Sequence, residues 1–253
     1  MYHFLSKITL GCLLLLILPL SIQAQKSSNP AAQGFNAAGS DAKAIAIADQ
    51  VMEAMGGRKA WDGTRYINWN FFGRRNLLWD KKKGQVRIDI PADNSTYIVD
   101  LNKETGLIKH KGVAMTQADS IKKYAGVAKS IWINDSYWLL MPYKLKDSGV
   151  TLKYKGEMPT EAGVASDVLE LTFQGVGRTP ENRYLVYVDK TTHLVAHWQH
   201  FRKASDEKPG MSTPWENYEK HGKILISGGR GTNRKLTDIQ VMSSVPKTKF
   251  VMF

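Results

Sequence analysis

The chain has 253 residues, with 35 Lys and Arg against 23 Asp and Glu, which gives a formal net charge of +12 at pH 7. The basic residues are scattered through short groups such as DKKKG, IKKYAG and GRGTNRK, without a long run. This distribution favours a solvated basic surface over a nucleic-acid site. We therefore expect no nucleic-acid partner, whereas an anionic membrane surface remains a candidate partner.

The first 24 residues have the pattern of a secretory signal peptide. Lys7 precedes the apolar run ITLGCLLLLILPL, and SIQAQ offers a small residue for cleavage after Ala24. The run is shorter than the ~20 residues that a membrane-spanning helix needs. We expect an exported protein that is soluble in the periplasm after cleavage, and association with the envelope stays open.

Cys12 is the single cysteine of the chain and lies inside this apolar run. Most of the run follows Cys12, so LGC does not fit a lipidation site. Removal of residues 1–24 leaves a chain without cysteine, and a secreted domain without disulfides depends on its core alone.

The chain after the signal begins with a polar stretch and a helix. Residues 25–39, QKSSNPAAQGFNAAG, contain Pro, Gly and small polar residues, which predicts a disordered tether. Ser40 can cap a helix whose apolar residues recur at helical spacing as far as Gly56 and Gly57. We expect residues 40–253 to form a single domain.

From Thr64 the hydrophobic pattern changes to the two-residue period of half-buried strands. The stretches RYINWNFFG, GQVRIDIP, STYIVDLN and TGLIKHKG alternate in this way, and seven more follow after residue 149. No alternation of strands with helices is present, so the strands are expected to be antiparallel. The sequence predicts a mainly β fold of the α+β class, with about ten or eleven strands.

Residues 116–141 interrupt the strands with a helical pattern, carried by Ile121, Tyr124, Ala128, Ile131 and Trp132. Asn134 or Asp135 can cap a second short helix that ends before Pro142. This second helix would carry Tyr137, Trp138, Leu139 and Leu140 of the aromatic stretch IWINDSYWLLMPYKL.

The three histidines of HLVAHWQH, His193, His197 and His200, are predicted on a strand. His193 and His197 would then stand about 13 Å apart, at ~3.3 Å per residue, and His200 would point to the other face. A single zinc ion cannot take ligands in this arrangement, so we expect no metal site.

No motif indicates catalysis. ISGGRGTNRK lacks the spacing of a phosphate-binding loop and is interpreted as a hairpin turn between two strands. There is no G-x-S-x-G motif and no assignable pair of carboxylates. We expect a protein that is not an enzyme, with no catalytic residues and no cofactor.

The order of these elements, with a helix ending in MGG and an antiparallel meander interrupted by helices, resembles the LolA/LolB-like outer-membrane lipoprotein-sorting superfamily of gram-negative bacteria. More closely, WINDSYWLLMPYKLKDSGVTLKY, VLELTF, GRTPENRYLVYVDK and HLVAHWQHF are similar to an uncharacterised family of exported gram-negative proteins assigned to that fold. The resemblance implies a curved antiparallel sheet that forms an unclosed half-barrel, with a few helices covering an apolar cavity for acyl chains.

This resemblance gives a set of candidate residues for the apolar cavity and its lid. They are Trp69, Phe71, Ile88, Ile98, Trp132, Tyr137, Trp138, Leu140, Leu171, Phe173 and Trp198. The same side chains can instead fill the concave core, because aromatic residues do both. The leading interpretation is a module that binds a lipid or acylated ligand. The alternatives are a protein-binding or stress-sensing module and, third, a hydrolase without a recognisable motif.

Overall fold

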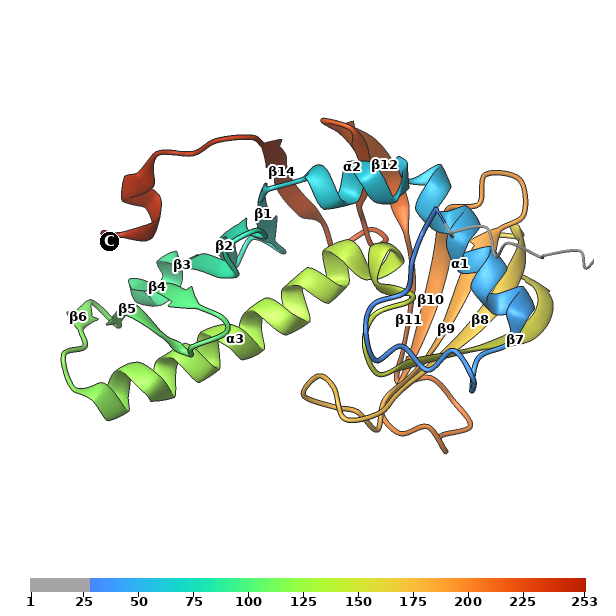
Figure 1. Cartoon of the computed structure of the whole chain (residues 1–253), viewed down its shortest axis with the longest axis horizontal. Helices are drawn as coiled ribbons and strands as arrows, with labels where there is room; N and C mark the ends of the chain where they lie inside the picture. The colour runs from blue at the N-terminus through green and yellow to red at the C-terminus, as the bar shows by residue number, and fades with distance from the viewer. Residues whose placement is uncertain (1–27) are drawn as a thin grey trace, which may run out of the picture.

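The structure is a computed structural model, and it describes residues 28–253 (Figure 1). The predicted signal peptide, with Cys12 and the cleavage point after Ala24, lies outside the described residues. Between residues 28 and 253, no helix combines the length and the apolar composition needed to cross a membrane.

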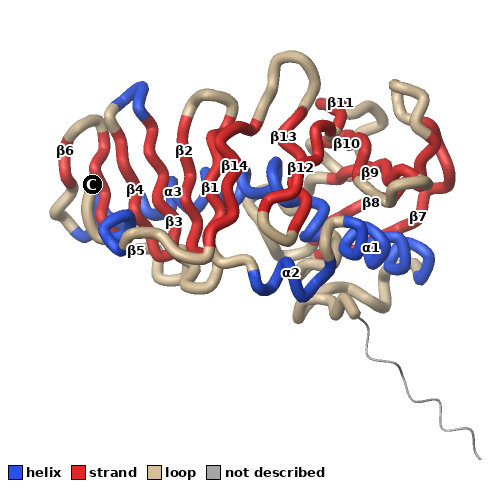
Figure 2. Tube along the Cα trace, turned by 90° about the horizontal axis from the view of Figure 1, so that it is seen from above, coloured by secondary structure: helices blue, strands red, loops and turns tan. Residues whose placement is uncertain are grey.

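The largest sheet is antiparallel and has seven strands (Figure 2). Its strands are β1 (Tyr66–Phe71), β2 (Arg75–Asp80), β3 (Gln85–Ile90), β4 (Ser95–Asp100), β5 (Thr105–His110), β6 (Val113–Ala114) and β14 (Leu236–Met242). Their order is β14-β1-β2-β3-β4-β5-β6. We call this the first sheet.

The second sheet has five antiparallel strands in the order β11-β10-β9-β8-β7. These are β7 (Val150–Pro159), β8 (Ala165–Phe173), β9 (Arg183–Asp189), β10 (Val195–Phe201) and β11 (Met211–Pro214). A two-stranded ribbon, β12 (Glu216–His221) and β13 (Ile224–Gly229), follows in the chain.

The ribbon connects the two large sheets. One residue, Trp215, separates β11 from β12, and the end of β13 meets the residue before β14 through a single bridge between Gly229 and Lys235. The sheets are therefore large, antiparallel and not closed into a barrel, as expected. The strand count was too low, because β2, β6 and β11 join the eleven predicted strands within the described residues. β2 was missed because its sequence does not alternate between apolar and polar residues. Its consecutive apolar residues Leu77, Leu78 and Trp79 are all buried.

Three α-helices are found among the described residues: α1 (Ala42–Ala54), α2 (Gly57–Gly63) and α3 (Ala118–Leu140). α3 runs under the first sheet and reaches the second (Figure 1). It is one continuous helix of 23 residues, so the predicted break at Asn134 or Asp135 is wrong. Asp135 is fully buried in mid-helix and has a partner outside the helix instead of capping one.

The predicted tether is also wrong for residues 28–39, which are fixed against residues 146–150 at the start of β7. The backbone N–H of Ala32 donates to the Lys146 carbonyl, and that of Asn36 donates to the Val150 carbonyl, at 3.0 Å in both cases. The Asn29 side chain donates to Asp49 at 2.7 Å. This segment covers the beginning of β7, at the edge of the second sheet, where backbone groups would otherwise be unpaired.

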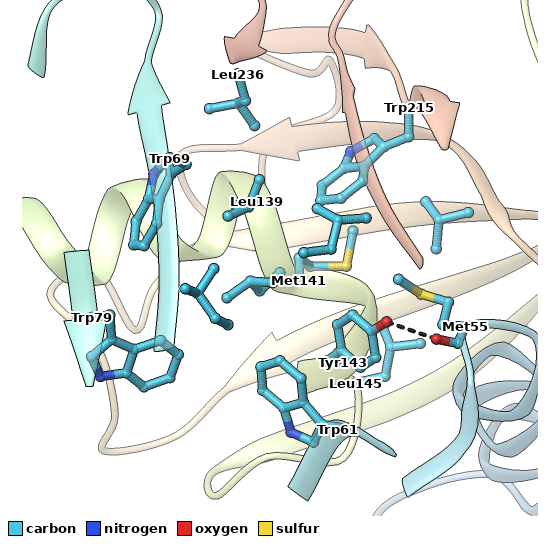
Figure 3. Close-up of a cluster of buried hydrophobic side chains, with 14 of the residues drawn as sticks. Met55, Trp61, Trp69, Trp79, Leu139, Met141, Tyr143, Leu145, Trp215 and Leu236 are labelled. Atoms are coloured by element: carbon cyan, nitrogen blue, oxygen red, sulfur yellow. Dashed lines mark hydrogen bonds between the residues drawn. The ribbon is translucent and has the colours of Figure 1, made fainter. Parts of the chain in front are cut away.

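The hydrophobic core continues from the first sheet to the ribbon and α1 (Figure 3). Trp69 and Trp79 enter it from the first sheet, and Tyr143 enters from the 3-10 turn η2 (Met141–Lys144) that ends α3. The Tyr143 hydroxyl shares its one hydrogen between the carbonyl oxygens of Met55 and Leu225, which lie 2.8 and 2.7 Å away. One side chain thus ties the end of α1 to β13.

Candidate functional site

Seven of the eleven candidate residues have exposed fractions of 5% or less, and six of these belong to the hydrophobic core cluster. These six are Trp69, Phe71, Ile88, Leu140, Leu171 and Trp198. All six belong to one packed core, in which they contact other side chains. In the described structure these residues fill the concave side of the sheets.

Ile98 does not belong with the others. It faces the opposite side of β4 from Tyr97 and Val99, which point toward the core, and it is absent from the core cluster. It is nevertheless 4% exposed, because β4 is buried on both faces. Its placement in a concave cavity was therefore wrong.

The remaining four candidates, Trp132, Tyr137, Trp138 and Phe173, are half-buried and pack against the core. Trp132 stands apart from the other three, because its ring packs on Trp79 of the first sheet at 5.2 Å between centroids.

Tyr137, Trp138 and Phe173 gather with four further rings, two of them from the second sheet, into one group that we call the aromatic cluster. Its members are Phe72, Tyr137, Trp138, Phe173, Tyr184, Trp198 and Trp215.

The aromatic cluster is built around Trp198 of β10. The Trp198 ring lies 5.1 Å from Trp138, 5.1 Å from Tyr184 and 5.6 Å from Trp215, between centroids. Tyr137 contacts Tyr184 at 5.4 Å. β8, β9 and β10 are neighbours in the sheet, so their inward residues form a continuous aromatic surface under the last turns of α3.

The polar atoms of the aromatic cluster carry no proton chemistry near neutral pH. The Tyr137 hydroxyl is buried and has no hydrogen-bond partner among the described residues. Burial holds the pKa of Tyr137 well above its usual value of 10 and raises the pKa of Tyr184 to about 12. Both phenols therefore stay neutral, and the cluster presents an apolar surface with a few hydrogen-bond donors.

Arg230 is a buried cation beside the aromatic cluster that the sequence did not reveal. It is 2% exposed, and its guanidinium lies 3.5 Å from the centroid of the Trp215 ring. It donates to the Trp138 carbonyl and, at 2.7 Å, to the Ser227 hydroxyl. Burial lowers the pKa of Arg230 to about 9. Arg230 fastens the end of α3 to the ribbon.

The predicted hairpin turn around Arg230 is present between β13 and β14. Within ISGGRGTNRK, nothing in the residue pattern separates this buried arginine from Arg234, which is exposed. The one available signal was its position directly after a strand that ends in two glycines.

Asp135 and Arg75 form a second polar contact that the sequence did not predict. Arg75 donates twice to the Asp135 carboxylate, at 2.6 and 2.7 Å, and Asp135 is 0% exposed. Burial raises the pKa of Asp135, while the Arg75 ion pair opposes this shift. The pair joins α3 to β2 just before the aromatic residues, so it positions them.

The three histidines do not converge. His193 lies in the turn before β10, with a φ of 56° that allows the turn, while His197 and His200 point to opposite faces of β10. His197 is hydrogen-bonded to the Ser212 hydroxyl at 2.7 Å. Across residues 28–253, no group of three His, Cys, Asp or Glu side chains is placed to hold a metal ion.

A hollow of about 350 Å³ lies away from the aromatic cluster, between the ribbon and β14. Its lining is mixed: Asn217, Glu219, His221, Ile226, Gly228, Lys235, Leu236, Thr237, Asp238 and Ile239. A second hollow of about 10 Å³, beside Asn29 and Tyr143, is too small for a ligand. Neither hollow contains any of the eleven candidate residues.

Comparison with known proteins identifies two structural neighbours. A DUF1329 family protein from Desulfovibrio piger ATCC 29098 matches with a TM-score of 0.46 at 14% identity, over 82% of this chain and 96% of that one. MucB matches with a TM-score of 0.29 at 14% identity, over 84% of this chain and 64% of that one. No protein-family model and no curated protein matches the chain. At these scores neither neighbour assigns a function, and membership of the LolA/LolB-like superfamily stays a prediction.

Proposed function

We propose that this protein is an exported, non-enzymatic module of the cell envelope that binds an apolar ligand, a lipid or an acyl chain, at the aromatic cluster. The proposal is supported by the partial exposure of Tyr137, Trp138, Phe173 and Tyr184 on one side of an otherwise sealed core. Apolar ligand sites are lined mainly by such side chains, with a few polar groups that fix orientation.

The cluster has the layout of a site that opens when the last turns of α3 move. The rings of Tyr137 and Trp138 belong to α3, whereas Phe173, Tyr184 and Trp198 belong to the second sheet. A small separation of helix and sheet would give an acyl chain aromatic surface on both sides. The ring contacts resist this separation, and the Arg230 hydrogen bond to Trp138 additionally holds the end of α3 to the ribbon.

Trp138→Ala with Trp132→Ala as its control tests the proposal. Both tryptophans are half-buried on the same helix, but Trp132 packs on Trp79 outside the aromatic cluster. Titration with the apolar probe N-phenyl-1-naphthylamine should show binding that Trp138→Ala weakens by about tenfold, equivalent to ~1.4 kcal/mol. Trp132→Ala should leave the binding within about twofold of the wild type, at most ~0.4 kcal/mol.

A wild type that binds no probe, with no lipid in an organic extract of the purified protein, would contradict the proposal. Equal losses in the two variants would also contradict it, because the aromatic cluster would then have no special role.

A second candidate function, the binding of an extended polypeptide, is favoured by the 350 Å³ hollow. The hollow lies where β14, an edge strand, separates from β13. An edge strand can pair with an added strand, and side-chain pockets then select the sequence. A photo-crosslinking residue at Thr237 should capture a polypeptide if this is correct, and the same residue at the exposed Thr105 should not. The first function predicts no difference between the two positions.

Export is tested by the intact mass of the protein recovered from an envelope fraction. We expect a chain that begins near Gln25 and carries no lipid. A diacylated N-terminus at Cys12 would contradict both the cleavage point and the soluble state.

A further inference from the structure

The outer face of the first sheet, opposite α3, is crossed by residues 243–253, which we call the strap (Figures 1 and 2). The strap includes the 3-10 turn η3 (Lys247–Phe250), and it is held by Arg87 of β3. Arg87 donates to the Lys249 carbonyl at 3.2 Å and to the Met252 carbonyl at 2.8 Å. The Phe250 ring lies 6.3 Å from that of Tyr66.

The strap lies over a row of apolar side chains on this outer face. Opposite residues on paired strands share a face, so Leu78, Arg87, Ile98 and Leu107 form one row across β2 to β5. Leu78 and Ile98 are 8% and 4% exposed although they point away from the core.

The strap turns its own apolar residues outward. Val251, Met252 and Phe253 are 64%, 54% and 46% exposed, and the adjacent Leu107 is 42% exposed. These are four of the six exposed large apolar side chains in the part of the chain that the structure describes. Lys109, on the same face as Leu107, lies 5.5 Å from the Phe253 ring, so the four belong to one patch.

The charged side chains of the strap have one sign. The strap, SSVPKTKFVMF, contains Lys247 and Lys249, both exposed, and no acidic residue. On the sheet beneath it, the Asp89 carboxylate accepts two bonds from Arg87, at 2.7 and 3.0 Å, and one from Thr96 at 2.9 Å. This acid is neutralised by its partners, whereas the lysines are free to face an external anion.

We infer that the strap is a peripheral membrane contact that recognises an anionic phospholipid surface. Apolar side chains inserted at the headgroup level and lysines beside anionic lipids act together in such contacts, and neither group suffices alone. An exposed apolar group surrounded by basic residues is complementary to an anionic lipid surface. The net charge of +12 adds a long-range attraction to the same surface. The patch lies on the first sheet, away from the aromatic cluster, so this contact is independent of ligand binding (Figure 1).

Vesicle co-sedimentation of the protein recovered from the cell envelope tests the inference. Vesicles of equal parts phosphatidylglycerol and phosphatidylcholine should bind the wild type, and binding to phosphatidylcholine alone should be at least about tenfold weaker. The double variant K247E/K249E and the triple variant V251S/M252S/F253S should each reduce binding to the anionic vesicles by about tenfold or more.

Matched controls come from elsewhere on the surface. K220E/K223E removes two exposed lysines at the turn of the ribbon, and Val127→Ser removes an exposed apolar side chain of α3. Both should bind the anionic vesicles within about twofold of the wild type. All variants share the same N-terminus, so differences between them report the substituted surface. Their melting temperatures and naphthylamine binding should be unchanged, which separates this test from that of the aromatic cluster.

A direct readout places the strap at the lipid. Val251→Cys labelled with an environment-sensitive dye should shift to the blue with anionic vesicles, and Val127→Cys should not. Absence of wild-type binding, equal binding to neutral vesicles, or a loss in the K220E/K223E control as large as in K247E/K249E would each overturn the inference.

Discussion

The two halves of α3 are stabilised by different kinds of contact. The first half lies on the first sheet as an ordinary amphipathic helix, with Ala125 and Ala128 buried, Lys122 and Lys123 exposed, and the Tyr124 ring 4.2 Å from His110. The second half, from residue 133, buries Asp135, Ser136, Leu139 and Leu140 together. A helix segment enclosed on several sides needs internal partners for its polar groups, and Arg75 supplies one.

This difference shows that the effect of a substitution on stability depends on where along the helix it lies. An amphipathic segment tolerates change on its exposed face, whereas an enclosed segment tolerates almost none. The following substitutions compare the two halves directly.

Leu140→Glu should have the largest effect, because Leu140 is 1% exposed and a carboxylate there has no water and no partner among its described neighbours. We expect a loss of more than ~5 kcal/mol, seen as failure to fold in circular dichroism. Val127→Glu, on the exposed face of the first half, should fold normally. A folded Leu140→Glu variant would contradict the enclosure of Leu140 in the closed arrangement described here.

Asp135→Ala should be next, because it leaves the Arg75 guanidinium largely buried without its carboxylate. We expect a loss of ~3 kcal/mol in urea unfolding, at the lower end for a broken buried pair, since Arg75 keeps 21% of its side chain exposed. Asp135→Asn retains hydrogen-bonding capacity and should lose less. A loss below ~1 kcal/mol for Asp135→Ala would make this ion pair equivalent to a surface one.

Acidification should lower the stability of the fold through two histidines of β10. Burial lowers the pKa of His197 from 6.5, with Glu161 opposing the shift, and burial with the Arg202 charge lowers that of His200. Both residues therefore contribute full stability above pH 6.5, and this contribution is lost as the pH falls through their folded-state pKa values. Urea midpoints should fall from pH 7 to pH 5, less steeply in His197→Gln, and a flat profile would contradict the shift.

Lys129→Ala should have the smallest effect, although the Lys129 ammonium lies 2.7 Å from the Glu104 carboxylate. Both side chains are about a third exposed, so water screens the pair. We expect a change below ~1 kcal/mol in urea unfolding, with Lys129→Gln as the control. A loss as large as that of Asp135→Ala would erase the distinction between the two halves.

The sequence predicted every strand that alternates cleanly and the helical character of residues 116–141. It failed where a residue's role depends on a partner far along the chain. Asn134 and Asp135 have the side chains of a helix cap, and the distant Arg75 makes Asp135 a buried mid-helix residue instead. Ile98 is apolar and buried like a core residue although it faces outward, because the strap covers the outer face of its strand. The strap lies more than 140 positions later in the chain.

The residue types of the candidate site were predictable, but which individual residues belong to the aromatic cluster was less so. Tyr137, Trp138, Phe173 and Trp198 do meet, because inward positions on neighbouring strands and one helix face can be inferred from their periods. Tyr184 and Trp215 also belong, but strand order decides this, and order is a tertiary property. Nothing in the local pattern separates the buried Arg230 from its exposed neighbours.

The pairing of β1 with β14 determines when, during synthesis of the chain, the first sheet can be completed. Tyr66 lies opposite Met242, so the inner edge of the first sheet stays open until nearly the whole chain has been synthesised. Loop closure over such a sequence distance is slow compared with hairpin formation, which joins β2 to β5 locally. A nascent chain halted before residue 236 therefore presents β1 as an unprotected edge, the kind of surface that holdase chaperones occupy.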